Sequence, residues 1–374
     1  MDQQVASVPR IEALDVLRGF SLGGIFVVNI MAMSGPFTFE GGAAHDLVGI
    51  FFHNKFYVLF GFLFGYSLTM QFRSAERAGA NAVARTVRRC LALMAIGLLH
   101  RVFFYDSEVL FGYGAIALVL LALSRIRIRT ALITAAVPFG LFAVVMTAMQ
   151  LFGGDSASSE SDRSTQLEAM RAGWLDAAAY RWDGFVHNLP QFLLFGLLNV
   201  LPTLLLGFVA GKRRILEQPQ RYLPWLGRVQ IIGYGIGLPI AALETLTDLP
   251  LAGPAYLAAP LLTAAYSATV LQLLHRYSWL REVFAPAGKL AATNYIGQSV
   301  LAAILFTGYG FAMAGRMNDW VILAIAAAVY AAQLAASAWY IRRHRYGPIE
   351  WVLRMATYGT LHPNRTQIPS TAGS

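Results

Sequence analysis

Long apolar runs recur along the whole chain and limit what it can fold into. Ten stretches are long enough to cross roughly 30 Å of hydrocarbon as helices, which takes about 20 mostly apolar residues. They lie near residues 14–34, 47–71, 87–105, 108–124, 130–152, 189–211, 226–243, 254–274, 290–313 and 318–340. Only 13% of the residues are charged, whereas a soluble globular domain carries about 25%. We therefore expect an all-α fold, a polytopic integral membrane helix bundle of about ten transmembrane helices.

The distribution of Lys and Arg predicts how this bundle is oriented. When the connections are assigned alternately to the two sides of the membrane, one side carries 22 of the 29 Lys and Arg residues and the other carries five. Cytoplasmic loops are enriched in these residues, so we expect both termini in the cytoplasm and the protein in a bacterial inner membrane. The net charge of +9 comes from short clusters between apolar runs. This pattern argues against a nucleic-acid partner.

The chain is expected to form one transmembrane unit, residues 1–359, followed by a disordered tail over 360–374. Residues 286–359 are its C-terminal motif region, and 153–188 form the longest connection, on the outer side. In that connection apolar residues recur every three or four positions. They are Leu167, Met170, Trp174, Ala178, Trp182 and Phe185. The spacing predicts an amphipathic helix on the outer membrane surface, which either covers the mouth of the bundle or only packs on the outer leaflet.

Arg18 and Asn29 are polar residues inside the first apolar run, and polar groups at membrane depth often face a protein interior or a hydrated cavity. They are eleven residues apart, which leaves them within roughly 20° of one helix face and about 16 Å apart along the axis. We expect both to line one hydrated tunnel. The alternatives are a local ion pair between Arg18 and Asp15, and an interhelical hydrogen bond for Asn29.

A second polar group is predicted in the outer half of the bundle, because the expected topology brings several helix ends to that depth. Its candidate catalytic residues are Asn29, His45, Lys55, His100 and Glu108. Histidines and acids at one level can supply a general base, an orienting carboxylate and a cation for a developing oxyanion. The alternative is a hydrated vestibule without chemistry. No metal site is expected, because Cys90 is the only cysteine and no HExxH spacing occurs.

A third polar group is predicted near the cytoplasmic side. Its candidate ligand-binding residues are Arg18, Asn294, Gln298 and Arg354, with Lys289, Thr293 and Glu350 close by in the sequence. Arginine side chains around a polar helix start suit an anionic phosphate, such as that of a nucleotide carrier. The alternative is simple contact with lipid headgroups.

Glycine pairs at a spacing of four residues predict close helix packing. They are Gly19 with Gly23, Gly61 with Gly65, and Gly207 with Gly211. A homodimer built through a glycine-lined helix is a further expectation from the same spacing.

Several motifs in order resemble the YeiB family over residues 10 to 359. The N-terminal motifs are LDVLRGF from Leu14 through Asn29, the Lys55–Gly65 run, and GLLH ending at His100 with Glu108 and Tyr113 beyond. The C-terminal motifs are similar to that family's domain of unknown function 418. They are Gly288-Lys289, Thr293-Asn294-Tyr295, Gln298-Ser299, and GPIEW from Gly347 with Arg354 and Thr357-Tyr358-Gly359.

The YeiB family resembles a wider transmembrane acyltransferase superfamily that includes heparan-alpha-glucosaminide N-acetyltransferase. By that resemblance the donor is acetyl-coenzyme A or another acyl-coenzyme A, and Asn29 matches an active-site asparagine. The catalytic histidine of the acetyltransferase lies in the following loop. Here His45 is the only histidine in that loop, at a different spacing. His100 matches the GLLH pattern, with Glu108 where aspartate is usual.

These observations predict a membrane-embedded acyltransferase that modifies an acceptor presented from the outside, either a small molecule or a lipid or glycan. Arg18, Asn294, Gln298 and Arg354 would hold the donor's phosphates. His100 or His45 would act as the base, Glu108 would orient His100, and Asn29 or Lys55 would stabilise the oxyanion. The alternatives are a transporter or flippase that uses the same polar pathway, and a structural partner of another membrane complex.

Overall fold

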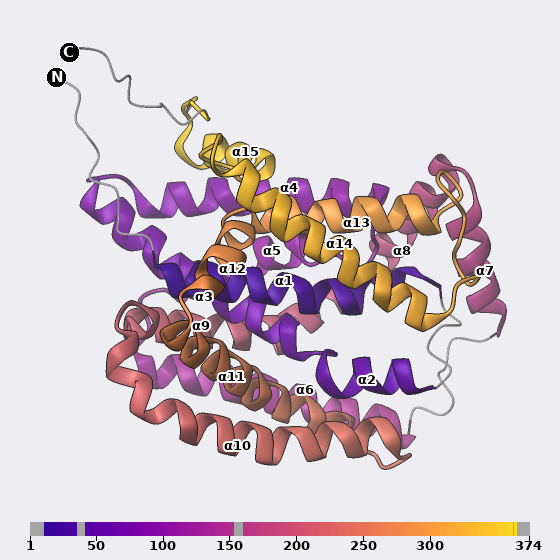
Figure 1. Ribbon diagram of the computed structural model, residues 1–374, viewed down its shortest axis with the longest axis horizontal. Coiled ribbons are helices and arrows are strands. Elements are labelled where there is room, and N and C mark those ends of the chain that lie inside the picture. Colours follow the sequence, from indigo (N-terminus) through magenta and orange to yellow (C-terminus); the bar gives the residue numbers. More distant parts are fainter. Residues whose placement is uncertain (1–10, 36–41, 153–159, 362, 365–374) are drawn as a thin grey trace.

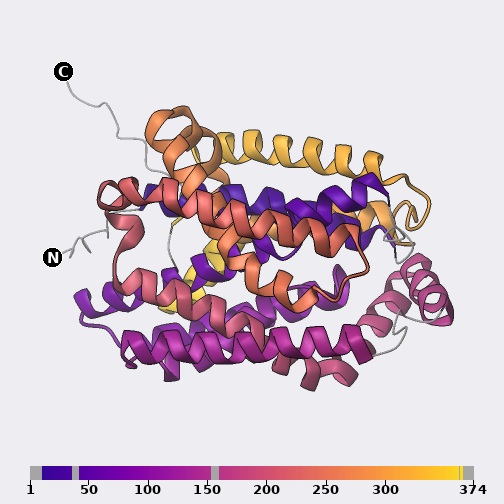
Figure 2. The ribbon, with the colours of Figure 1, turned by 90° about the horizontal axis from the view of Figure 1, so that it is seen from below.

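The computed structural model describes residues 11–35, 42–152, 160–361 and 363–364. In these ranges every regular element is helical, and the helices pack into one bundle (Figures 1 and 2). The helices are α1 (Glu12–Met33), α2 (Ala43–Phe51), α3 (Lys55–Arg77), α4 (Ala82–Phe103), α5 (Leu110–Ala122), α6 (Ile128–Phe152), α7 (Glu160–Arg171), α8 (Trp174–Phe195), α9 (Leu201–Lys212), α10 (Pro219–Leu246), α11 (Ala252–Arg276), α12 (Trp279–Lys289), α13 (Ala291–Phe306), α14 (Asp319–Tyr340) and α15 (Pro348–Tyr358). The predicted all-α fold is confirmed.

Within the described residues, seven helical segments are long and apolar enough to cross a membrane. They are Glu12–Met33, Ala43–Arg77, Ile128–Phe152, Trp174–Lys212, Gln220–Leu246, Ala252–Arg276 and Asp319–Tyr340. The protein is therefore a multi-pass membrane protein. The other three predicted spans correspond to α4, which carries four arginines, and to α5 and α13, which have only 13 and 16 residues. The count of ten crossings and the cytoplasmic location of the termini stay predictions.

The second predicted span, 47–71, is interrupted. Helix α2 ends at Phe51 and α3 begins at Lys55, and between them Asn54 has a left-handed φ of 65°. The Lys55 ammonium donates to the Gly49 carbonyl oxygen at 2.6 Å. Because the last carbonyls of a helix have no intrahelical partner, this bond stabilises the break.

The predicted surface helix is divided between two elements. A break at Ala172 and Gly173 separates α7 from α8, so Leu167 and Met170 lie on a different helix from the rest of the stripe. Helix α8 continues through a π-helical turn, η1 (Gly196–Val200), into α9. The predicted span at 189–211 is thus the second half of a longer helical segment that begins at Trp174. Residues 153–159, Arg10 and most of the predicted tail lie outside the described residues.

The predicted close packing at glycines is confirmed where α3 crosses α9. A Cβ added to Gly65 would overlap the Leu204 backbone, and one added to Gly207 would overlap the Phe62 backbone. At the crossing of α1 and α12, a Cβ on Gly19 would overlap the Phe284 carbonyl. These glycines therefore pack within the chain. The predicted homodimer gains no support from them.

An aromatic layer crosses the middle of the bundle. We use this name for the stacked rings of Tyr57, Phe60, Phe64, Tyr113 and Tyr295, together with Phe56, which lies one helical turn before Phe60 on α3. Tyr113 is its centre, because its ring stacks on Tyr57 at 6.0 Å, on Phe60 at 5.8 Å and on Phe64 at 5.5 Å. The layer joins α3, α5 and α13, and it separates the two cavities described next.

Candidate functional site

A cavity of about 390 Å³ lies on one side of the aromatic layer. We call it the Asn29 cavity. Its wall comes from α1, the α2–α3 break, the start of α3, the loop between α4 and α5, α5 itself, and the region of α8 and η1. Most lining side chains are aliphatic or aromatic. The polar ones are Asn29, His53, Asn54, Arg101, Asp106, Ser107 and Glu108. A mostly apolar cavity with a few convergent polar groups is typical of small-molecule sites.

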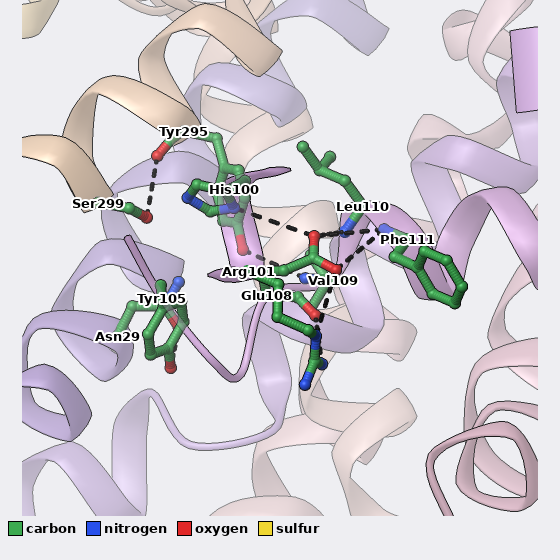
Figure 3. Close-up of polar contacts among 10 residues, drawn as sticks. All are labelled: Asn29, His100, Arg101, Tyr105, Glu108, Val109, Leu110, Phe111, Tyr295 and Ser299. Atoms are coloured by element: carbon green, nitrogen blue, oxygen red, sulfur yellow. Dashed lines mark hydrogen bonds and ion pairs between the residues drawn. The ribbon is translucent and has the colours of Figure 1, made fainter. Parts of the chain in front are cut away.

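Asn29 is held in the cavity wall by a residue that follows α4. The Tyr105 hydroxyl donates to Asn29 Oδ1 at 3.4 Å (Figure 3). In this assignment the amide oxygen has a partner, and the amide N–H groups of Asn29 are the donors that a substrate oxygen can use.

Glu108 has a structural role in addition to its place in the cavity wall. Its buried carboxylate accepts the backbone N–H of Leu110 at 2.6 Å and that of Phe111 at 3.1 Å. These are orphan donors of the first turn of α5, so the carboxylate caps that helix. His100 Nδ1 and Arg101 Nε each lie 3.9 Å from a Glu108 oxygen (Figure 3).

Arg101 reaches the same carboxylate from the end of α4. Its guanidinium lies over the rings of Phe185 and Phe192, 5.0 and 4.7 Å from their centroids. Cation–π contacts of this kind stabilise a desolvated arginine. Arg101 also lines the Asn29 cavity, so its charge is available to a ligand there.

The structure places His100 Nδ1 3.9 Å from Glu108, its predicted orienting carboxylate, but outside the wall of the Asn29 cavity. His100 is buried behind the cavity wall, with its ring 5.3 Å from that of Tyr295. Among the described residues, neither ring nitrogen has a hydrogen-bond partner. His45 and Lys55 do not line the cavity either. Lys55 instead holds the Gly49 carbonyl at the break, so its ammonium is not placed to stabilise an oxyanion in the cavity.

His53 takes the position in the cavity wall that was predicted for His100 or His45. It lies in the α2–α3 break, which the sequence interpretation treated as the interior of one helix. Asn54 at that break was the available signal, because asparagine adopts left-handed backbone conformations more readily than most residues.

A second cavity of about 140 Å³ lies on the other side of the aromatic layer. We call it the Arg18 cavity. Three cations line it, Arg18 from α1, Arg89 from α4 and Lys289 from the end of α12. Arg18 donates to the Ser67 hydroxyl and lies 3.4 Å from an Asp15 oxygen, as the local ion-pair alternative predicted. The three cations make this cavity suited to an anionic group.

Glu350 is the carboxylate in the wall of the Arg18 cavity, and most of its bonding capacity is used. It accepts the backbone N–H groups of Ala292 and Thr293 at 2.7 and 3.2 Å and the Thr293 hydroxyl at 2.6 Å. It therefore caps α13, as Glu108 caps α5.

Three of the four predicted phosphate ligands lie elsewhere. Asn294 donates to the Ala287 carbonyl at 3.2 Å and to Ser337 at 2.9 Å, so it joins helices. Gln298 donates to Gln333 at 2.8 Å. Arg354 lies between the rings of Tyr346 and Tyr358, 4.8 and 4.6 Å from their centroids. Of the four predicted phosphate ligands, only Arg18 lines the Arg18 cavity. Arg89 was missed as a ligand because its position next to Arg88 reads as a loop cluster that signals topology.

The structure places the two ends of the predicted tunnel in two separate cavities. Asn29 and Arg18 line different cavities. The aromatic layer lies between them, with Phe56 in the wall of the Asn29 cavity and Phe60 in the wall of the Arg18 cavity. The spacing of the two polar residues on α1 puts them on one helix face, but they line two different cavities.

Comparisons with known proteins identify the chain's relatives. A family profile described as "Protein of unknown function (DUF418)" matches residues 210–360. The chain is 30% identical to "Uncharacterized protein YxaH" of Bacillus subtilis, over 95% of this chain and 96% of that protein. It is 26% identical to "Uncharacterized protein YeiB" of Escherichia coli, over 94% and 97% of the two chains. No solved structure matches. The chain therefore belongs to the YeiB family, which carries the DUF418 region.

Proposed function

We propose that this protein is a membrane-embedded acyltransferase whose reaction takes place in the Asn29 cavity. The observation that carries the proposal is that Asn29, His53 and Arg101 share the wall of one mostly apolar cavity. An amide donor, a base and a cation are the groups that acyl transfer requires. The resemblance of Asn29 to the active-site asparagine of the acetyltransferase superfamily points the same way.

The residues have the following roles in this proposal. The acceptor hydroxyl or amine attacks the thioester carbon, and His53 takes its proton. The Asn29 amide N–H groups donate to the carbonyl oxygen as it becomes an oxyanion. When the intermediate collapses, the carbon–sulfur bond breaks, and the departing thiolate takes the proton from His53. Tyr105 orients the Asn29 amide, and Glu108 holds Arg101 and the start of α5.

The donor in this proposal is an acyl-coenzyme A, and its phosphates bind at Arg18, Arg89 and Lys289. These cations replace the predicted set that included Asn294, Gln298 and Arg354. Because the two cavities are separate, the acyl end reaches Asn29 only if donor binding displaces side chains of the aromatic layer. The topology that fits has both termini and the Arg18 cavity on the cytoplasmic side of a bacterial inner membrane.

The test is an assay of thiol release from acetyl-coenzyme A by the purified protein in lipid nanodiscs, with candidate acceptors added in turn. Asn29→Ala should lower kcat by about 10²-fold to 10³-fold. His53→Gln should lower it by about 10²-fold or more. His187→Gln is the matched control, because that side chain is 73% exposed. If His53→Gln and His187→Gln are equally active, the role of His53 is wrong.

Transport is the second candidate, favoured by a different observation. Two irregular helical segments, the α2–α3 break and the continuous helix with the π-helical turn η1, both line the Asn29 cavity. Discontinuous helices of this kind form substrate sites in transporters. Uptake of a substrate into liposomes without product formation would favour transport over acyl transfer.

A further inference from the structure

The Asn29 cavity extends to the lateral surface of the bundle along α8. Leu193 and Phe195 line the cavity and are still 39% and 36% exposed. Their neighbours Leu194 and Leu197 are also exposed. This stretch belongs to the apolar segment Trp174–Lys212, which is long enough to span a membrane. The rim of the cavity is therefore continuous with a surface that faces lipid.

The π-helical turn η1 contributes to this rim. Gly196 and Val200, the first and last residues of the turn, both line the cavity. A Cβ added to Gly196 would lie 2.9 Å from the Ile116 side chain, so the glycine lets this wall approach α5. π-Helical turns occur frequently at functional sites, and this one lies where the cavity meets the membrane surface.

A buried cation stands in the wall behind the rim. The Arg101 side chain is 10% exposed, and within the described part of the chain its Nε has no hydrogen-bond partner. Arg101 Nη2 donates to the Glu108 backbone carbonyl oxygen at 3.5 Å, whereas the Glu108 carboxylate lies 3.9 Å from Nε and already accepts the Leu110 and Phe111 N–H groups. Phe192 lies between Arg101 and the exposed rim of the cavity, because its ring contacts the Arg101 guanidinium and it directly precedes Leu193. Arg101 therefore retains donor capacity for a ligand in the cavity.

We infer that the Asn29 cavity binds an anionic lipid. A negatively charged oxygen group of the headgroup, phosphate or carboxylate, pairs with Arg101, and the hydrocarbon chain leaves past Leu193 and Phe195 into the bilayer. This inference rests on the proposed function and deepens it, because it identifies the acceptor as an anionic lipid whose headgroup also carries the attacking hydroxyl or amine. A planar guanidinium suits both oxygen groups through paired N–H donors, and the apolar walls suit the chain.

Photocrosslinking in nanodiscs tests this site through binding rather than turnover. The probes are a fatty acid, a phosphatidylglycerol and a neutral diacylglycerol, each with a diazirine on the same acyl chain. We expect the peptide that contains residues 192–197 to be labelled at least tenfold more by an anionic probe than by the neutral one. Labelling near Val137 and Val144 of α6, which are each 65% exposed, reports ordinary lipid contact and should not discriminate. Which anionic probe labels more strongly identifies the source of the charge.

Substitutions at Arg101 separate binding from folding. Arg101→Gln should abolish the preference for anionic probes, and Arg101→Lys should keep most of it. Arg101→Gln/Glu108→Gln removes both charges, so it avoids an unpaired buried carboxylate and should fold while still lacking the preference. Equal labelling by neutral and anionic probes, or an unchanged preference in the double variant, would overturn the inference. Anion-dependent labelling without acyl transfer would support the lipid site and contradict the proposed acyltransferase activity. Acyl transfer without such labelling would support the activity and contradict the lipid site.

Discussion

Phe56 and Phe60 lie one helical turn apart on α3, and each lines a different cavity. Four residues of α-helix cover about 6 Å along the axis. The barrier between the Asn29 cavity and the Arg18 cavity is therefore about one aromatic side chain thick on this side of the bundle. Tyr113 and Tyr295 complete it from α5 and α13, stacked on Phe60 at 5.8 and 6.5 Å. In the proposed reaction this layer keeps the two chambers apart until the donor binds.

Loss of the Tyr105 hydroxyl should weaken catalysis without removing it. Tyr105→Phe removes the bond that orients the Asn29 amide but leaves the amide in place. We expect kcat to fall about tenfold, because a lost neutral hydrogen bond is worth roughly 0.5–1.5 kcal/mol. The measurement is thiol release from acetyl-coenzyme A, beside Asn29→Ala, which should be more severe. If Tyr105→Phe reduced activity as strongly as Asn29→Ala, the orienting role would be wrong.

Neutral replacements at the Arg18 cavity should weaken donor binding. Hydrogen bonds to charged groups contribute about 1.5–3 kcal/mol, so Arg18→Gln and Arg89→Gln should each raise the Kd for acetyl-coenzyme A by about tenfold or more. Isothermal titration in detergent measures this change. Arg88→Gln is the matched control, because Arg88 is the exposed neighbour of Arg89 on α4. If Arg88→Gln raised the Kd as much as Arg89→Gln, the weaker binding would come from the change in net charge and not from the loss of a ligand in the Arg18 cavity.

Glu108→Ala should destabilise the fold. The substitution removes the cap of α5 and leaves the Arg101 charge buried without its carboxylate. Breaking a buried ion pair by removing one partner costs about 3–5 kcal/mol. Thermal unfolding in detergent should show a large fall in Tm, and Arg101→Gln/Glu108→Gln should recover part of it. Glu76→Ala, at an exposed position on α3, should leave Tm unchanged. A Tm for Glu108→Ala close to that of Glu76→Ala would contradict the capping role.

Alanine at the α3–α9 crossing should separate the two helices. A Cβ at Gly207 would overlap the Phe62 carbonyl, and backbone atoms cannot move aside as a flexible side chain can. We expect Gly207→Ala to lower the yield of monodisperse protein in size-exclusion chromatography. Gly140→Ala on α6 and Gly235→Ala on α10 are matched controls, because no atom of the described residues lies within 4 Å of the added Cβ. They should keep or slightly increase stability, because alanine favours helix by up to about 1 kcal/mol over glycine.

Hydrophobic periodicity predicted the long helices well. The predicted runs 14–34, 130–152 and 318–340 correspond to α1, α6 and α14 within two residues. Short interruptions were missed, because a break of two or three residues barely changes the apolar content of a 20-residue stretch. The left-handed Asn54 and the break at Ala172 and Gly173 are such cases.

The candidate site was predictable only in part. The shared face of Arg18 and Asn29 follows from helix geometry, and both residues do line cavities. Which residues of other helices meet them depends on how each helix is rotated and packed, and the sequence spacing does not encode this. Arg89 therefore joins Arg18, whereas Arg354 packs between two tyrosines. The stacking of aromatic side chains from α3, α5 and α13 is likewise a tertiary feature.

The most direct test of acyl transfer through two chambers is a density map of the protein in nanodiscs with a non-hydrolysable acetyl-coenzyme A analogue and a bound antibody fragment. We expect density for the phosphates beside Arg18, Arg89 and Lys289. The acyl end should lie within hydrogen-bond distance of Asn29, with Phe56 or Phe60 displaced from its position in the free protein. An analogue bound elsewhere, or bound at Arg18 with the aromatic layer still closed and the acyl end remote from Asn29, would contradict the proposed acyl transfer.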